Sequence, residues 1–371
     1  MTPRPFVYLM WFGGSAGITA ALTPGARRIA HRFGLVDRPG GQSYKWHHTP
    51  TAYLGGLVIA LAVLVVGTFG TRGHSPADRA TVILLGGLVC ALVGAWDDWR
   101  SLGVGPKLLP TLVGGAAVWT AGVRVGLSGN AVVDLVLTMA WIVVVTHAVN
   151  VIDNMDGVAV GLAAISATGV FAIAMTSGQT RVAVMAAAVA GASLGFVPFN
   201  FRRATVFLGD AGTLFLGFML ASLALALDIQ VGSAVTRVTV PVLLMGVPVF
   251  NTFLVVVSRT RGGRRITVGG TDGVAHRLVA LGLSRSLAAV AFWTAGALCS
   301  GLAVLVSRLG MGVAAVVAGV VMVSGATGVW LFDRVDTVTG ESGPAGRPLL
   351  VRWPRGSRVL AGTEPRVEQA P

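Results

Sequence analysis

The chain has 371 residues, of which 54% are hydrophobic and only 12% are charged. That composition excludes an ordinary water-soluble enzyme and favours a protein that a lipid bilayer surrounds. The formal net charge of +13 would indicate a nucleic-acid partner in a soluble chain, but its distribution along this one argues against that partner.

Apolar runs of about 20 residues, enough to cross the hydrocarbon core, recur along nearly the whole chain. The first run, at 5–22, lacks a basic start and a cleavage site, so we expect a retained helix and no signal peptide. The fold class that follows is an all-α, polytopic integral membrane protein of about ten or eleven transmembrane helices with a cytoplasmic active-site cleft. This transmembrane domain would occupy 1–332, and 333–371 would form a disordered cytoplasmic tail.

Positive charge lies mainly on one predicted side of the membrane. With the N-terminus outside, 21 of the 28 Lys and Arg residues fall in cytoplasmic loops or in the tail. This positive-inside pattern predicts a multi-pass protein of the plasma membrane and explains the charge without nucleic acid.

The first charged motif joins Asp97 and Asp98, at the end of one span, to Lys107 at the start of the next. Adjacent carboxylates at a membrane boundary repel each other and lose solvation, which favours a bound cation or a proton relay there. A plain loop pair remains the alternative. Only Lys45 and Lys107 are lysines among 28 basic residues, which indicates a need for a compact ammonium, as at a phosphate.

The second motif runs from Asn150 to Gly157 and contains Asp153, Asn154 and Asp156. A helical turn would place the two aspartates, three residues apart, on one face. Oxygen ligands of this kind suit a hard cation such as Mg²⁺, although helix capping would explain either aspartate alone.

Two further motifs follow in the C-terminal half. Asp210 lies in a Phe-Leu-Gly-Asp turn, shortly after Arg202, which is either a positive-inside residue or a phosphate contact. The long basic loop at 259–285 carries His276 and Arg277, which together could bind a diphosphate, although a single histidine is more often structural.

In this order, the motifs resemble those of the polyprenyl-phosphate N-acetylhexosamine-1-phosphate transferases, over about residues 34–282. The family includes the phospho-MurNAc-pentapeptide translocase and the GlcNAc-1-phosphate transferases. The resemblance implies transfer of a sugar-1-phosphate, first of all GlcNAc-1-phosphate, from a UDP-sugar to undecaprenyl phosphate, with release of UMP. It also implies a role in cell-wall or surface glycan synthesis and a dependence on Mg²⁺, with Mn²⁺ as the alternative ion.

The resemblance assigns roles residue by residue. The catalytic group would be Asp97, Asp98, Lys107, Asp153, Asp156 and His276. The substrate-binding group would be Lys45, His47, Asn154, Gly157, Arg202 and Arg277, and the metal ligands would be Asn150 and Asp210. The family pattern does not decide which aspartate is the base.

The chain departs from the family pattern at several motif positions, and the missing loop histidine among them bears on the sugar that it takes and on activity. The pattern has histidine near Gly273 or Ala275, Asp for Asn251, Asn for His147, Gly for Asn154 and Arg for Tyr53. The loop without its histidine run argues against the pentapeptide translocase.

Three alternatives stay open: a same-fold transferase for another nucleotide sugar in a specialised pathway, an inactive binding homologue, and a membrane transporter. A transporter predicts charges deep inside the spans, whereas here they lie almost entirely at one face. We expect the lipid tail to use a groove near 239–257, where Pro241 or Pro248 would bend the helix. A homodimer is left open.

Overall fold

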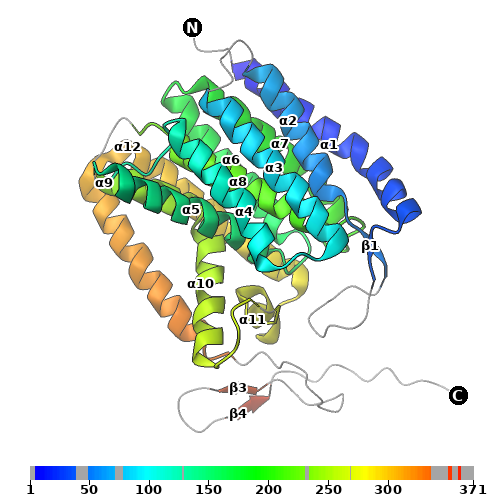
Figure 1. The fold of residues 1–371 in the computed structure, drawn as a ribbon. Coiled ribbons are helices and arrows are strands. Elements are labelled where there is room, and N and C mark those ends of the chain that lie inside the picture. The colour runs from blue at the N-terminus through cyan, green and yellow to red at the C-terminus, as the bar shows by residue number, and fades with distance from the viewer. Residues whose placement is uncertain are drawn as a thin grey trace, which may run out of the picture.

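The computed structural model describes residues 5–38, 49–71, 78–127, 129–229, 234–267, 269–335, 350–352 and 358–360. Its helices form one bundle, and short strands lie at the end of the bundle that carries α11 (Figure 1). The helices are α1 (Pro5–Phe33), α2 (Gly55–Gly70), α3 (Arg79–Arg100), α4 (Val104–Thr120), α5 (Ala131–Ile152), α6 (Val158–Thr176), α7 (Thr180–Asn200), α8 (Gly209–Ala226), α9 (Ala234–Leu244), α10 (Gly246–Arg261), α11 (Val274–Ala280) and α12 (Arg285–Phe332). The strands are β1 (Val36–Asp37), β2 (Thr51–Ala52), β3 (Leu350–Arg352) and β4 (Arg358–Leu360).

The structure confirms the all-α, polytopic membrane fold. Within the described residues, eight helical segments are long and apolar enough to cross a bilayer, or nine if the bent pair α9 and α10 is one span. The sequence count of about ten or eleven is higher because it included the shorter runs that form α2 and α4, of 16 and 17 residues.

The helix α12 accounts for two of these spans. Its 48 residues would extend about 72 Å if straight, far more than one bilayer crossing needs. Both of its ends lie near α11, because α11 leads into Arg285 after four residues while Arg277 of α11 donates to the carbonyl oxygen of Phe332. The helix therefore turns back on itself, as its two differently directed parts in Figure 1 show.

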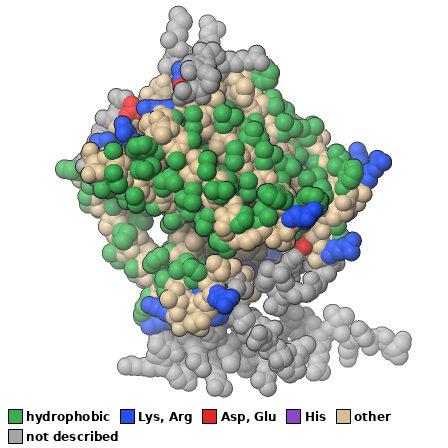
Figure 2. Space-filling model, viewed as in Figure 1, with side chains coloured by type: hydrophobic (Ala, Val, Ile, Leu, Met, Phe, Trp, Pro, Cys, Tyr) green, Lys and Arg blue, Asp and Glu red, His purple; other side chains and the backbone are tan. Residues whose placement is uncertain are grey.

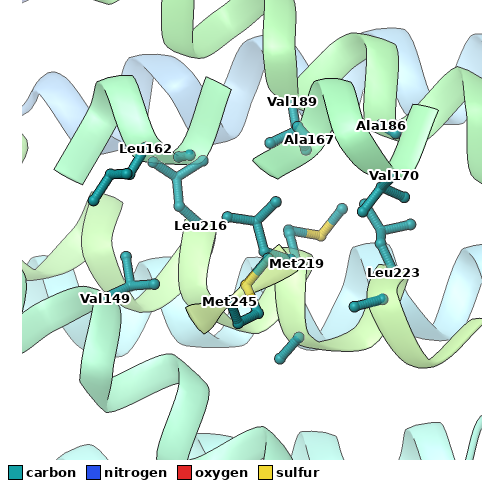
Figure 3. Close-up of a cluster of buried hydrophobic side chains, with 14 of the residues drawn as sticks. Val149, Leu162, Ala167, Val170, Ala186, Val189, Leu216, Met219, Leu223 and Met245 are labelled. Carbon is teal, nitrogen blue, oxygen red and sulfur yellow. The ribbon is translucent and has the colours of Figure 1, made fainter. Parts of the chain in front are cut away.

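The helix α8 lies at the centre of the bundle, and nearly all of its residues are buried. Figure 3 shows Leu216, Met219 and Leu223 of α8 among apolar side chains from α5, α6 and α7. Small residues bring its first turn against the neighbouring helices: a Cβ on Gly56 would lie 2.0 Å from the Gly212 nitrogen, and one on Gly94 would lie 2.4 Å from the Asp210 carbonyl oxygen. This close packing of α2, α3 and α8 fixes the position of Asp210.

The outer surface of the bundle is apolar. Large exposed side chains cover the second half of α12, including Val316, Val320 and Met322, and apolar atoms spread across the face in Figure 2. Contiguous apolar surface of this extent is costly in water, so acyl chains are its natural surroundings.

The predicted bend near 239–257 is confirmed. The helices α9 and α10 meet at 78° across a break at Met245, between Pro241 and Pro248. Proline prevents a straight continuation because it lacks an amide donor and clashes with the preceding turn.

The strands are short. β1 and β2 form an antiparallel pair beside the end of α1, and β3 pairs with β4. Most of the tail after residue 335 lies outside the described residues, so its predicted disorder stays a prediction.

Candidate active site

The centre of the site is an ion pair that joins three helices. The Lys107 ammonium, from the first turn of α4, lies 2.7 Å from Asp97 Oδ2 at the end of α3 and 2.5 Å from Asp210 Oδ2 at the start of α8. The lysine and both aspartates are at most about a quarter exposed, so water screens the three charges only partly. Asp210 is thus brought together with Asp97 and Lys107, more than a hundred residues earlier in the sequence.

A fourth helix adds Asn150 to this cluster. Its Nδ2 donates to Asp210 Oδ1 and to Thr213 Oγ1, at 2.8 Å each. Both carboxylate oxygens of Asp210 are therefore engaged, one by the amide of Asn150 and the other by Lys107.

Asp98 holds the start of α8. Its Oδ1 accepts from the Asp210 backbone N–H at 2.8 Å, and its Oδ2 accepts from that of Ala211 at 3.1 Å. A carboxylate is favoured there because the first N–H groups of a helix lack partners and carry partial positive charge. Gly209 permits the contact: its φ is +67°, and a Cβ on it would lie 2.5 Å from Asp98 Oδ2.

The loop from Asp153 to Gly157 follows the end of α5. Asp153 is half-buried, and its carboxylate makes no hydrogen bond or ion pair with any residue that the structure describes. Burial, reinforced by the nearby charges of Asp156, Asp210 and Asp98, raises the pKa of Asp153 to about 8. The Asp153 carboxylate therefore lies among other acidic groups with no described hydrogen-bond donor of its own.

The rest of the 153–157 loop is held by backbone contacts. Asp156 Oδ2 accepts from the Ala204 N–H at 3.0 Å, and the Gly157 N–H donates to Asn200 Oδ1 at 3.0 Å. Gly157 has a φ of +79°, and a Cβ on it would lie 2.8 Å from the ring of Phe201, so its predicted substrate-binding role coincides with a tight turn.

The basic loop at 259–285 is organised by Asp272, which is buried. Arg259 Nε donates to its Oδ2 at 2.9 Å and Arg264 donates to its Oδ1. The guanidinium groups outweigh burial and hold the pKa of Asp272 below its usual range. Sequence reasoning missed this pairing, whose signal was an aspartate within a run of arginines.

Arg277 is also engaged by the protein itself. It donates to the carbonyl oxygens of Asp272, Phe332 and Val335 and to Ser258 Oγ. These bonds fasten α11 to the ends of α10 and α12 and indicate a structural position. Contact with a diphosphate stays a prediction for this residue.

His276 is buried beside Arg277, and burial lowers the pKa of its imidazole to about 4 against the opposing charge of Asp272. It is therefore neutral at physiological pH. His276 lies in the first turn of α11. Asn251 of α10 fixes this turn, because its Oδ1 accepts from the Val274 N–H at 2.9 Å. Sequence reasoning did not assign Asn251 to the site.

Three predicted substrate-binding residues are not brought to the cluster around Lys107 by the described structure. Lys45 and His47 lie outside the described residues. Arg202 is exposed, has a φ of +68° and lies over the Phe201 ring at 5.7 Å. Tyr53, by contrast, lies close to the cluster: burial and the charges of Asp37 and Asp98 raise the pKa of its hydroxyl well above its usual range.

The donor set suits a hard divalent cation. Within the described residues no three His, Cys, Asp or Glu side chains form a ready metal cluster. Mg²⁺ does not need one, because it commonly binds through one or two carboxylates and completes its shell with water and substrate phosphates. Asp153, whose carboxylate makes no hydrogen bond with a described residue, would fit such a role, whereas the oxygens of Asp210 already accept from Lys107 and Asn150.

Comparison with known proteins finds a family model that matches the middle of the chain and relatives that align with most of its length. Residues 80–228 match the family model described as glycosyl transferase family 4. The chain is 30% identical over 286 residues to a probable undecaprenyl-phosphate N-acetylglucosaminyl 1-phosphate transferase of Bacillus subtilis, an alignment that covers 74% of this chain and 78% of that protein.

Two more relatives have names that refer to related transferases. A decaprenyl-phosphate N-acetylglucosaminephosphotransferase of Mycobacterium tuberculosis is 30% identical over 362 residues, with 86% of this chain and 89% of that protein covered. A phospho-N-acetylmuramoyl-pentapeptide-transferase of Limosilactobacillus fermentum is 32% identical over 227 residues, with 57% and 71% covered.

Proposed function

This chain belongs to glycosyl transferase family 4, and from that premise we propose that it transfers a hexosamine-1-phosphate to a polyprenyl phosphate in cell-wall synthesis. The finer proposal is a UDP-N-acetylhexosamine donor, first of all UDP-GlcNAc, undecaprenyl phosphate as acceptor and UMP as the leaving product. The relatives' names support the lipid phosphate and the amino sugar.

The observation that carries the proposal is the cluster in which Lys107 joins Asp97 to Asp210 while Asn150 and Asp98 hold Asp210 in place. Phosphoryl transfer needs little covalent chemistry from the protein; it needs positioned charges around two phosphates. A lysine between carboxylates, at one end of a membrane bundle, offers such charges where a lipid phosphate could reach them.

The reaction balances without ATP. An oxygen of the lipid phosphate attacks the sugar-linked phosphorus of the donor, a new phosphoanhydride forms, and the bond to UMP breaks with UMP leaving as an anion. Any proton on the attacking phosphate passes to a carboxylate at the site, for which Asp97, Asp98 and Asp153 are the candidates. The positive ammonium of Lys107 would attract the phosphate oxygens and hold them close to the transferred group.

Mg²⁺, or Mn²⁺ in its place, would neutralise the negative charge of the diphosphate when bound. Asp153 is the carboxylate best placed to hold it, because it makes no hydrogen bond with a described residue, whereas Asp210, the metal ligand that the resemblance implies together with Asn150, already accepts from Lys107 and from Asn150. His276, neutral and buried, would act by hydrogen bonding and carry no charge.

The proposal places the site at the cytoplasmic face of the plasma membrane. All the motif residues that the structure describes lie at helix ends or in loops on one side of the bundle, and 21 of the 28 Lys and Arg residues fall on that side in the sequence count. The 78° break between α9 and α10 supports a lipid groove there, since parted helices leave room for an acyl chain.

The test is transfer of labelled sugar-1-phosphate from UDP-GlcNAc to undecaprenyl phosphate by the purified protein, with and without Mg²⁺. Asp153→Asn is the informative variant, because the change is isosteric and the carboxylate has no hydrogen bond to lose among the described residues. Asp134→Asn is the matched control at the other end of the bundle, where the retained Oδ1 still accepts from the Leu127 N–H.

Metal-dependent lipid-linked product that Asp153→Asn abolishes and Asp134→Asn preserves would support the proposal. Absence of product from the wild-type protein with UDP-GlcNAc and with a panel of other UDP-sugars would refute it and favour a binding homologue.

A further inference from the structure

A cavity lies between the last turns of α1 and the end of α7. It has a volume of about 550 Å³ and is lined by Pro24, Arg27, Arg28 and His31 of α1 and by Phe199 of α7. That volume falls within the range of about 300–1,000 Å³ that is usual for small-molecule sites. None of the described residues that line it belongs to the carboxylate cluster, so the proposed transfer reaction leaves this cavity without a function.

The cavity forms because α1 extends past the end of α7. The two helices pack closely and run in the same direction: a Cβ on Gly191 would lie 2.1 Å from the Phe12 carbonyl oxygen, and one on Gly195 would lie 2.4 Å from that of Ala16. The same offset places the last residue of α7, Asn200, beside position 21 of α1, which continues for roughly a dozen residues more. Figure 1 shows α1 at the edge of the bundle, so this last part is open to its surroundings on several sides.

The cavity lies at a boundary of the membrane. A hydrocarbon core of about 30 Å takes up about 20 helical residues, so a span that begins at Pro5 reaches the far boundary near Pro24. The basic residues that line the cavity follow within two turns and therefore fall at the level of lipid headgroups. Phe199 lies at the level of the active site, because the next residue, Asn200, accepts from the Gly157 N–H.

The last part of α1 has an apolar flank and a basic flank. Leu22, Ile29 and Phe33 are exposed, and their spacing of seven and four residues places them on one face. At about 100° per residue, Arg27 and His31 lie on roughly the opposite face. A helix divided in this way lies in the membrane interface, with its apolar flank among acyl chains and its basic flank among headgroups.

The basic groups of the cavity have no counter-charge in the described structure. Arg27, Arg28 and His31 make no hydrogen bond or ion pair with any residue that the structure describes, and no carboxylate is among the described residues that line the cavity. Arginine side chains match phosphate groups through paired N–H donors. Pro24 and Phe199 add an apolar wall, which favours an amphiphile over a free anion.

We propose that this cavity binds the phosphate group of an anionic glycerophospholipid, with Arg27 and Arg28 as its ligands and His31 as a hydrogen-bonding neighbour. The positive-inside rule requires basic residues on this side of the membrane, but it does not require them to border one cavity. The site is separate from the transfer reaction, and the proposal does not depend on the proposed function. Its occupant is a lipid of the surrounding bilayer that stabilises the end of α1.

The test is thermal unfolding of the purified protein in detergent, titrated with phosphatidylglycerol or with phosphatidylcholine. A lipid that binds the folded protein raises the melting temperature, and we expect this of phosphatidylglycerol alone. In Arg27→Gln and in Arg28→Gln, the phosphatidylglycerol concentration that gives half of the rise should increase about tenfold, as for loss of a hydrogen bond to a charged group. Both side chains are exposed, so without lipid the variants should melt as the wild type does.

Arg32→Gln is the matched control, because it removes the same charge from the same helix. Arg32 is exposed in the last turn of α1 and does not line the cavity. With salt at about 150 mM, its loss removes only screened attraction and should change the half-rise concentration no more than about twofold. Equal weakening in Arg32→Gln, Arg27→Gln and Arg28→Gln would show a diffuse basic surface and would overturn the proposal, as would an equal rise with phosphatidylcholine.

Two further ligands separate the possible sources of the phosphate group. Inorganic phosphate should leave the melting temperature unchanged, and a rise equal to that with phosphatidylglycerol would show a site for a free anion and overturn the proposal. Undecaprenyl phosphate should bind Arg28→Gln as well as it binds the wild type. If the variant instead weakened its binding tenfold, the cavity would belong to the acceptor lipid and the proposal would fail. None of these measurements uses sugar transfer, so failure of the proposed function would leave their outcome unaffected.

Discussion

Replacing Gly209 by alanine tests how Asp98 positions the site. Gly209 has a φ of +67°, and a Cβ on it would lie 2.5 Å from Asp98 Oδ2, the atom that accepts from the Ala211 N–H. The new methyl group therefore forces the carboxylate away from the start of α8, and Asp210 follows because its own N–H donates to Asp98 Oδ1.

The magnitude follows from two contributions. A left-handed backbone costs alanine about 1 kcal/mol, and loss of one hydrogen bond to a charged group costs about 2 kcal/mol more, which gives about 3 kcal/mol in total. Gly34→Ala isolates the first contribution, because Gly34 has a φ of +69° and a Cβ on it would have nothing within 4 Å. Displacement of Asp210 should in addition reduce transfer about 100-fold, as small misplacements of reacting groups do.

The assays are thermal unfolding in detergent and transfer of labelled sugar-1-phosphate, both on the two variants side by side. We expect Gly209→Ala to melt well below Gly34→Ala and to lose transfer, and Gly34→Ala to stay active. Equal stability and equal activity of the two variants would refute the role given to the contact between Asp98 and α8.

Three further predictions follow from the charged groups. Lys107→Met leaves Asp97 and Asp210 without their shared ammonium, and we expect transfer to fall about 100-fold in the same assay, a result that near wild-type activity would contradict. His276 takes up a proton near pH 6.5 in the unfolded chain but only near 4 when folded, so stability is lost as pH falls from 6.5 to 4; the wild-type melting temperature should drop more steeply over that range than that of His276→Gln. Arg277→Lys removes most of the bonds that fasten α11, so limited proteolysis should cut the 259–285 loop faster, at unchanged net charge.

The sequence predicted the gathering of the motifs because each one stands at the end of an apolar run on the same side. Counting runs was enough to place Asp98, Asn150 and Asp210 at one face, and the structure joins these positions by hydrogen bonds of 2.8 Å. The bend between α9 and α10 was also predictable, since two prolines interrupt one run. These features depend on local pattern and on the thickness of a bilayer.

Other features depend on the partner that each side chain meets, which no local pattern contains. Arg277 looked like a phosphate ligand beside His276, yet its bonds reach Phe332 and Val335, more than fifty residues away. Asn251 reads as one polar residue in an apolar helix, and only its contact with Val274 reveals that it fixes α11.

The same dependence on distant partners explains why the motifs could not show which aspartate is the general base. A general base needs an oxygen free to take a proton, and Asp98 gives one oxygen to each of two N–H groups of α8 while Asp153 gives none to any described residue. In Asp98→Asn, the new amide would point a donor at one of those N–H groups and displace α8. Loss of transfer in that variant would therefore report a moved helix as well as a missing base. Gly209→Ala leaves the carboxylate's chemistry intact and moves only its position, so comparing the two variants separates positioning from proton transfer.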